Sequence, residues 1–208
     1  MMLIMHDKHH LSAEAILRYP AAETALKHEK ILEAASRLFR ERGFAGVSVA
    51  EIMKATGLTH GPFYNHFASK EALMAESIQH ASGKALAELD GTSPSGAGRA
   101  SFVQGYLSLS HRDAPGDGCL MAALAGEIGR EPVVRQSFTE HLRTTIEKLT
   151  GLFPGGTGRA RRRETIQMVS TMVGALVLSR AVDDPALSAE ILRDAQAGLL
   201  VAKGSRGH

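Results

Sequence analysis

The sequence predicts an all-α protein of about nine helices. Its 7 prolines are spread along the whole chain, and the segments between them are rich in Ala, Leu, Glu, Arg and Met at helical spacing. Proline disrupts a helix interior but is accepted in the first turn or beyond the end, so these positions favour helix boundaries. In addition, no stretch alternates Val, Ile or Thr with polar residues as a half-buried strand would.

Length and composition limit the class of protein. The 208 residues, 44% of them hydrophobic, can bury the core of one large domain or two small ones. The longest apolar run, 172–178, is too short to cross a bilayer, and the opening MMLIM lacks the length of a signal peptide. A single cysteine excludes an internal disulfide and favours a cytoplasmic location. The net charge of +2 does not identify a partner.

The first strong helix is expected over residues 24–42, which leaves residues 1–23 as an N-terminal extension or arm. Its apolar residues recur on one side, as in a helix that faces a core. They are Ile31, Leu32, Ala35, Leu38 and Phe39. Gly43 follows where a left-handed residue ends many helices, and Phe44 supplies the apolar contact that accompanies such a cap.

Two serine caps divide the next segment. Ser48-Val49-Ala50-Glu51 has the pattern of a capping box and predicts a helix over 48–56 that ends at Gly57. A short helix is expected at 59–66, and Ser69 begins a long one that runs to residue 90. Residues 24–74 therefore form a small N-terminal unit of three helices, and residues 75–90 connect it to the rest of the chain.

Beyond residue 90 the sequence predicts a larger helical domain over 91–208. The segment DGTSPSGAGR, residues 90–99, is a loop by composition and separates the two parts. The remaining helices are expected at about 99–111, 118–130, 132–152, 160–181 and 187–202. The basic run GRARRR, residues 158–163, is interpreted as a solvated loop.

The stretch GLTHGPFYNHFASKEAL, residues 57–73, has the turn chemistry of a helix-turn-helix. At 100° per residue, Phe63 and Phe67 share one face, while Gly61 and Asn65 share the opposite face. The aromatic face would pack on the first two helices, and the other face would offer groups that can contact a nucleic acid. Asn65, for example, can pair with adenine through two hydrogen bonds. The alternative is a tight helical corner in which Gly and Pro only end helices.

Residues 27–74, KHEKILEAASRLFRERGFAGVSVAEIMKATGLTHGPFYNHFASKEALM, resemble the DNA-binding domain of the TetR/AcrR family of bacterial transcriptional regulators. The resemblance rests on the helix followed by GF, the Ser-capped helix, the GLT turn, the aromatic corner and SKEAL. It implies a homodimer that binds double-stranded, palindromic operator DNA. The recognition helices of such dimers lie roughly 34–36 Å apart.

The resemblance also assigns positions within the DNA-binding domain. The positions that hold phosphates correspond here to Ser48, Tyr64, His66 and Lys70. Those that face base edges correspond to Thr59, His60, Gly61 and Pro62. Phosphate contacts would set affinity and salt dependence, and the groove residues, with Asn65, would set sequence preference.

Members of the family bind a small molecule among their middle helices, so the resemblance implies an inducer pocket and release of a repressor from its operator. The residues expected to line the pocket are Phe102, Tyr106, Cys119, Met121, Leu124, Phe138, Leu142, Met168 and Met172. Any one of them could equally be plain core. Residues 164–181 and 187–202 carry apolar stripes that would form a four-helix bundle with a second copy, or else pack within one chain.

Cys119 has two interpretations. It stands near an expected helix N-terminus, with Asp117 as a plausible cap, and such a position favours the thiolate and reaction with electrophiles or oxidants. Asp113 and Asp117 would oppose that effect, and free cysteine is commonly a small buried hydrophobe. The thiol is therefore either a sensor or a packing residue.

Other functions were weighed against DNA binding. No catalytic constellation, cofactor motif or metal site is expected, and the His-rich segment 6–10 favours only adventitious metal binding. One alternative is a helical enzyme or small-molecule carrier, and another is a dimeric adaptor that binds protein through residues 57–70. DNA binding should weaken steeply with salt, whereas an adaptor contact should not.

Overall fold

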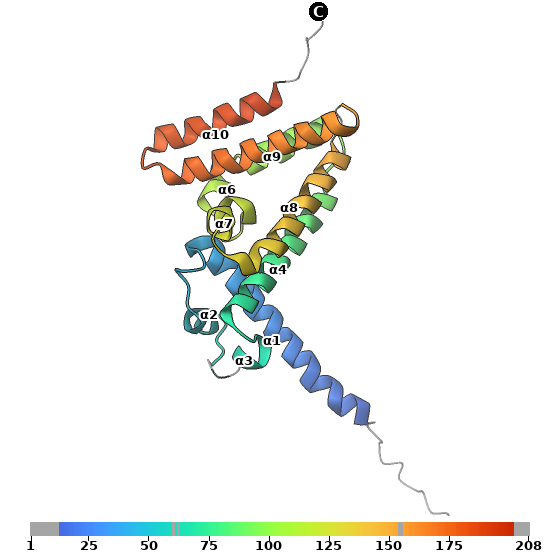
Figure 1. The fold of residues 1–208 in the computed structure, drawn as a ribbon, viewed down its shortest axis with the longest axis vertical. Coiled ribbons are helices and arrows are strands. Elements are labelled where there is room, and N and C mark those ends of the chain that lie inside the picture. The colour runs from blue at the N-terminus through green and yellow to red at the C-terminus, as the bar shows by residue number, and fades with distance from the viewer. Residues whose placement is uncertain (1–12, 60, 62, 154–155, 202–208) are drawn as a thin grey trace, which may run out of the picture.

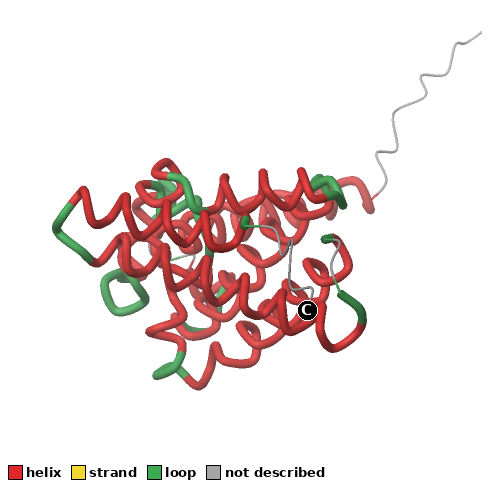
Figure 2. Tube along the Cα trace, turned by 90° about the horizontal axis from the view of Figure 1, so that it is seen from above, coloured by secondary structure: helices red, strands yellow, loops and turns green. Residues whose placement is uncertain are grey.

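The computed structural model describes residues 13–59, 61, 63–153 and 156–201, and these ranges form helices without any strand (Figures 1 and 2). The all-α prediction is confirmed. The helices are α1 (Ala13–Arg42), α2 (Val49–Ala55), α3 (Phe63–His66), α4 (Lys70–Asp90), α5 (Gly96–Tyr106), α6 (Leu109–Asp113), α7 (Leu120–Ile128), α8 (Pro132–Leu152), α9 (Gly158–Ala181) and α10 (Pro185–Leu200).

The expected caps of the N-terminal unit are present. Gly43 adopts φ 75° and so occupies the left-handed conformation that ends α1. The Ser48 hydroxyl accepts the N–H of Glu51, whose carboxylate accepts the N–H of Ser48 at 2.8 Å. At the start of α4, the Ser69 hydroxyl accepts the N–H of Ala72 at 3.2 Å. Each cap satisfies a helix-terminal group that would otherwise lack an intrahelical partner.

The predicted start of the first helix was wrong. The helix begins at Ala13 rather than at residue 24, and it passes through Pro20. Proline removes one N–H from the helix, but the Ala-rich sequence that follows has high helix propensity. An ion pair of 2.6 Å between Lys27 and Glu23, one turn apart, adds support. Residues 21–26 are exposed, and Figure 1 shows this end of α1 projecting from the body.

Three other boundaries also differ from the prediction. The expected helix over 99–111 is divided into α5 and α6, because Ser108 caps a new helix by accepting the N–H of His111. The expected helix over 59–66 is described as a helix only over Phe63–His66. The GRARRR segment belongs to the first turns of α9 and is not a loop.

The helices enclose two hydrophobic cores. The first lies among α1–α4 and α7, and the second among α5 and α7–α10. The helix α7 contributes to both, with Leu124 in the first core and Met121 in the second. Helices α4 and α8 pack side by side, and α9 packs on α10 at the far end (Figure 1). None of the described helices has the length and apolar character that crossing a membrane requires.

Candidate nucleic-acid interface and internal cavity

The corner between α2 and α3 is built on a buried aromatic pair. Phe63 and Phe67 are 0% and 2% exposed, and their ring centroids lie 5.6 Å apart. Gly57, at φ 69°, lets the chain turn between the two helices. A helix of one turn has little stability alone, so burial of these rings is what fixes α3 against α1 and α2.

The opposite side of the corner faces solvent. Thr59, Gly61 and Asn65 are exposed, and Tyr64 is 66% exposed. The structure therefore separates an aromatic inner face from a polar outer face, as the helical spacing predicts. His60 and Pro62, the other two positions expected at base edges, lie outside the described residues.

Two other positions expected at phosphates, Ser48 and Lys70, make hydrogen bonds within the chain. The exposed Ser48 hydroxyl donates to Glu51 at 2.7 Å, and the Lys70 ammonium donates to the Phe44 carbonyl at 2.6 Å. The Arg42 guanidinium lies 2.6 Å from the Glu51 carboxylate. This contact, followed by the hydrogen bonds from Ser48, lowers the pKa of Glu51 to about 2. Lys70 keeps two further N–H donors, so its bond to Phe44 still allows an anion contact.

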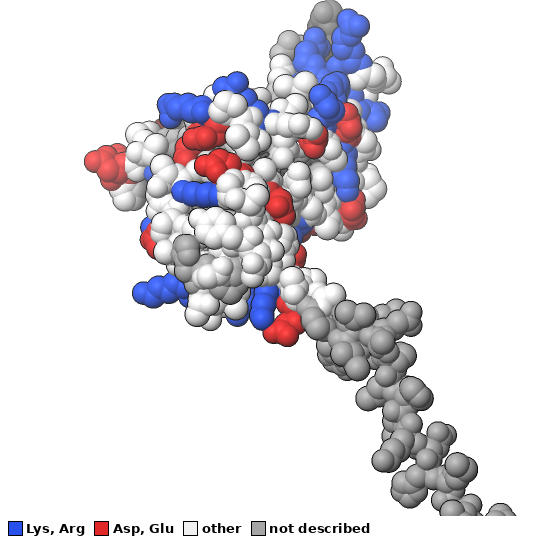
Figure 3. All heavy atoms as spheres, turned by 60° about the horizontal axis from the view of Figure 1, so that its bottom comes forward, with Lys and Arg blue, Asp and Glu red and all other residues white. Residues whose placement is uncertain are grey.

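His66 is half-buried beside His28, with their ring centroids 5.8 Å apart. Burial, and then the charges of His28 and Lys27, lower the pKa of His66. The imidazole is therefore neutral near pH 7, and it would contact a phosphate as a hydrogen-bond donor without a full charge. Figure 3, which brings the lower part of the molecule forward, shows Lys and Arg scattered around a largely uncharged surface. This agrees with the weak overall charge.

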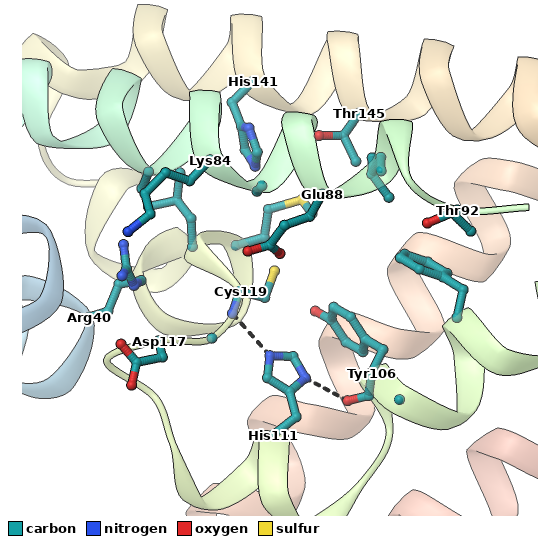
Figure 4. A pocket seen from close by; sticks show the side chains of 18 of the residues that line it. Arg40, Lys84, Glu88, Thr92, Tyr106, His111, Asp117, Cys119, His141 and Thr145 are labelled. Atoms are coloured by element: carbon teal, nitrogen blue, oxygen red, sulfur yellow. Dashed lines mark hydrogen bonds between the residues drawn. The ribbon is translucent and has the colours of Figure 1, made fainter.

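A cavity of about 620 Å³ lies between α4, α5, α7 and α8 (Figure 4). Four of the nine expected lining residues border it, namely Phe102, Tyr106, Cys119 and Met121. The other five belong to the cores, as the alternative had it: Leu124, Met168 and Met172 are buried, and Phe138 and Leu142 pack against them.

Sequence reasoning missed the polar part of the lining. These residues are Arg40, Lys84, Glu88, His111, Asp117, His141 and Thr145. They come from α1, α4, α6, α8 and the loop before α7, so no single segment displays them together. The one available signal was a histidine or threonine placed at a buried position of a helix, as for His141 and Thr145 on α8.

His111 lines the cavity, and both of its ring nitrogens form hydrogen bonds (Figure 4). Its Nε2 is 3.0 Å from the N–H of Cys119, so it must accept, and its Nδ1 is 2.6 Å from the Tyr106 carbonyl, so it must donate. These partners require the neutral imidazole. Burial is the main reason that the pKa of His111 is lowered.

Acidification should therefore weaken the fold through His111. Because its folded-state pKa is lowered below 6.5, its contribution to stability is complete above pH 6.5 and is lost as the pH falls through the folded pKa. The loss is at most about 1.4 kcal/mol per pH unit for one proton. Urea unfolding between pH 7.5 and 5 should show a smaller decline in the His111→Gln variant than in the natural chain. Equal declines in the two proteins would contradict this assignment.

Cys119 is the N-cap residue of α7 and is half-buried. Asp117 does not cap the helix, contrary to expectation, because no side chain makes a cap hydrogen bond there. Asp117 is exposed instead. The thiol borders the cavity, so either of its two interpretations stays a prediction.

Helix α7 and the loop before it make two contacts with the N-terminal unit. Arg40 of α1 donates to the carbonyl of Gly116, in the loop before α7, through Nε at 2.8 Å and also through a terminal nitrogen. At the other end of α7, the Glu127 carboxylate accepts the N–H of Phe44 at 2.7 Å. The Phe44 carbonyl accepts from Lys70 of α4. The turn after α1 is thus held from two helices that line the cavity.

The α9 and α10 stripes expected to join two subunits are partly internal. Met168, Met172 and Ala175 are buried within the chain, so for these residues the alternative, packing within one chain, holds. The amphipathic pattern marks a buried face without showing which partner buries it. The outer face of α9 still exposes large apolar side chains at Ile166, Val177 and Leu178, the last of them 58% exposed.

The N-terminal unit matches a known family. The sequence model described as "Bacterial regulatory proteins, tetR family" matches residues 31–76, which contain α2, α3 and the start of α4. A TetR-family regulator from Agrobacterium tumefaciens has a similar structure over 84% of this chain and 98% of its own, with a TM-score of 0.67 and 25% identity. The chain belongs to the TetR family.

Curated relatives of this TetR-family protein match half of its chain or less. The HTH-type transcriptional repressor DhaR of a Mycobacterium species is 30% identical over 105 residues, which cover 48% of this chain and 51% of DhaR. UidR of Escherichia coli K12 is 33% identical over 105 residues, 50% of this chain and 53% of UidR. The chain thus spans about half the length of these relatives, and only 21% of the Bacillus subtilis regulator YerO.

Another similar structure, E. coli NemR in its reduced form, covers 83% of this chain and 94% of its own, with a TM-score of 0.68 at 20% identity. At this identity the likeness concerns the fold alone, and it extends over most of the chain. Among the described residues, no group of three His, Cys, Asp or Glu side chains is arranged to hold a metal ion.

Proposed function

We propose that this protein is a repressor that binds palindromic operator DNA as a homodimer and leaves it when a small molecule enters the cavity. The observation that carries the proposal is the exposed polar face of α3 and the preceding turn, held rigidly by Phe63 and Phe67. In this arrangement Thr59, Gly61 and Asn65 enter the major groove, and Tyr64 contacts the backbone. Asn65 reads a base edge, and Gly61 allows close approach of the duplex.

The dimer in this proposal uses the outer face of α9. Ile166, Val177 and Leu178 are exposed on that helix, and Leu187 of α10 is 42% exposed. A second copy would bury them in a symmetric contact, and the two recognition faces would then meet successive major grooves. The dimer also doubles the modest local charge, which favours binding to phosphate.

The proposed response to a ligand passes through α7. That helix borders the cavity at Cys119 and holds the Phe44 N–H through Glu127. A ligand that displaces α7 would therefore move the turn between α1 and α2. To shift the protein between two arrangements, the ligand must prefer one of them by a few kcal/mol.

A salt series on selected DNA fragments tests the proposal. Bound fragments from a random pool identify the site, and the logarithm of the affinity should then fall linearly with the logarithm of salt concentration. Replacing Tyr64 by Ala should weaken binding to every sequence alike, by about 1 kcal/mol or more. Replacing Asn65 by Ala should change which base is preferred at one position.

Arg193→Ala is the matched control, because Arg193 lies on α10 and is exposed. It removes one positive charge without touching the α2–α3 corner, so its salt slope should equal that of the natural chain. DNA binding that survives high salt unchanged, or that responds to Arg193 as much as to Tyr64, would contradict the proposal.

A further inference from the structure

The cavity contains two buried hydroxyl groups that have no hydrogen-bond partner among the described residues. They are Tyr106 Oη, on α5, and Thr145 Oγ1, on α8. Thr145 is only 6% exposed. Figure 4 shows the Tyr106 hydroxyl pointing into the cavity toward Cys119, with Thr145 projecting from the opposite wall. Buried polar groups are nearly always satisfied in native proteins, so an unsatisfied pair facing one space calls for an explanation.

The direction of the Thr145 hydroxyl is unusual for this protein. Three other helical threonines donate to the carbonyl one turn earlier: Thr139 to Arg135, Thr150 to Ile146 and Thr165 to Arg161. Such back-bonding is the usual way for a threonine inside a helix to satisfy its hydroxyl. Thr145 makes no such bond, and its side chain lines the cavity.

Tyr106 is also fixed in place without being satisfied. Its ring stacks edge-on against His111, with centroids 4.7 Å apart, and its carbonyl accepts from the same imidazole. Burial, and then the neighbouring Cys119, raise the pKa of Tyr106 well above its ordinary value, so the hydroxyl keeps its proton. The Cys119 thiol is close enough to contribute to this rise, but it is only a weak acceptor, and its geometry does not satisfy the Tyr106 hydroxyl. The Tyr106 phenol is therefore a hydrogen-bond donor in the cavity wall that a ligand could use.

The charged lining residues do not favour an ionic ligand. Arg40 and Lys84 are balanced by Glu88 and Asp117, so the formal charges of the lining sum to zero. Lys84 also pairs with Glu33 through both carboxylate oxygens, at 2.9 and 3.0 Å. Burial lowers the pKa of His141, and likewise that of His111, so both imidazoles are neutral near pH 7.

Most of the remaining side chains of the lining are apolar, although Thr92 and Ser101 add two further hydroxyl groups. The apolar side chains are those of Ala81, Ala85, Leu89, Phe102, Leu120 and Met121. We infer that the cavity takes an uncharged, mainly apolar compound that carries a hydrogen-bonding carbonyl oxygen, such as a ketone on a flat ring system, with the Tyr106 and Thr145 hydroxyls as the donors available to it. A carbonyl oxygen only accepts hydrogen bonds, so it suits hydroxyl donors that lack a partner. This inference rests on the proposed response to a small molecule and specifies its chemistry.

A matched pair of probes tests the chemistry on the full chain. The ketone is 2-acetylnaphthalene, and its hydrocarbon isostere is 2-isopropenylnaphthalene, in which a methylene group replaces the oxygen. Equilibrium dialysis should show that the ketone binds about tenfold more tightly, as expected for a buried oxygen that gains donors. The ions 2-naphthoate and 2-naphthylmethylammonium should bind more weakly than the ketone, because the lining offers neither of them an excess of opposite charge.

The variants Tyr106→Phe and Thr145→Val remove the hydroxyls and keep the shapes. Each should reduce the preference for the ketone by several-fold and leave hydrocarbon binding nearly unchanged. Ser77→Ala is the control, because the Ser77 hydroxyl is also buried and unsatisfied but does not line the cavity. It should leave the preference intact. Equal binding of ketone and hydrocarbon, no binding of either, tighter binding of an ion, or an unchanged preference in both variants would overturn the inference.

DNA binding measured separately distinguishes this inference from the proposed function. If the chain binds its selected DNA but shows no ketone preference, the ligand chemistry is wrong and DNA binding stands. If the ketone preference depends on Tyr106 and Thr145 while the ketone leaves DNA affinity unchanged, the chemistry stands and the proposed regulatory response is wrong.

Discussion

The Phe63→Ala variant is expected to lose about 3–5 kcal/mol of unfolding free energy. Phe63 is fully buried and meets Phe67 and Tyr64 at centroid distances of 5.6 and 5.1 Å. Truncation leaves a cavity beneath α3, and a one-turn helix has no other means of keeping its position. Domains of ordinary stability have only about 5–15 kcal/mol in total, so much of the chain should be unfolded near body temperature. Urea unfolding followed by circular dichroism measures the effect.

The neighbouring residue supplies the control for that experiment. Tyr64 is 66% exposed, and Tyr64→Ala should change the unfolding free energy by much less than Phe63→Ala. Under the proposed function, Tyr64→Ala weakens DNA binding while the fold persists, whereas Phe63→Ala loses both together. A Phe63→Ala protein as stable as Tyr64→Ala would show that the aromatic pair does not hold the corner.

The second large effect is expected at Gly43. Its φ of 75° strains any residue with a Cβ, and a Cβ built there would lie 2.1 Å from Glu127 Oε1. Alanine therefore adds a strain of about 1–2 kcal/mol and also displaces the carboxylate from the Phe44 N–H. Loss of a hydrogen bond to a charged group costs roughly 1.5–3 kcal/mol. The expected total is about 2.5–5 kcal/mol, measured by urea unfolding.

Gly57 separates the two contributions. It has φ 69°, but a Cβ there would meet nothing within 4 Å, so Gly57→Ala reports backbone strain alone. Gly43→Ala should cost more than Gly57→Ala in the natural chain and about the same in a Glu127→Ala background, where the clash is gone. Equal costs in the natural chain would mean that the contact between α7 and the turn contributes nothing.

The parts of the fold that were predicted correctly depend on local chemistry. The cap at Gly43 and the reciprocal bonds of Ser48 and Glu51 involve groups within one turn of each other, so their residue types alone indicate the geometry. The division of Phe63 from Asn65 follows from helical periodicity in the same way. The expected start of α1 at residue 24 was wrong, because the Ala-rich sequence around Pro20 continues the helix through that proline.

The cavity and the α9 face could not be predicted in this way. Met121 and Met168 are both methionines on helices and both lie in the second core, yet only Met121 also borders the cavity, because that difference depends on distant helices. Thr145 and Lys84 line the same cavity only because α4 and α8 pack together. An apolar stripe in the sequence of α9 predicts that this face of the helix is buried, but it does not indicate by which helices. The structure shows that Met168 and Met172 are buried by other helices of the same chain.

The peptide unit of Phe44 connects these observations. Its N–H is bound by Glu127 of α7, and its carbonyl is bound by Lys70 of α4. If α4 and α7 moved together by the same amount, the segment that contains Phe44 would move with them and both hydrogen bonds would persist. Only a displacement of one helix relative to the other would lengthen or break one of these bonds. The turn after α1 would therefore respond to the relative position of α4 and α7 and not to a motion that they share.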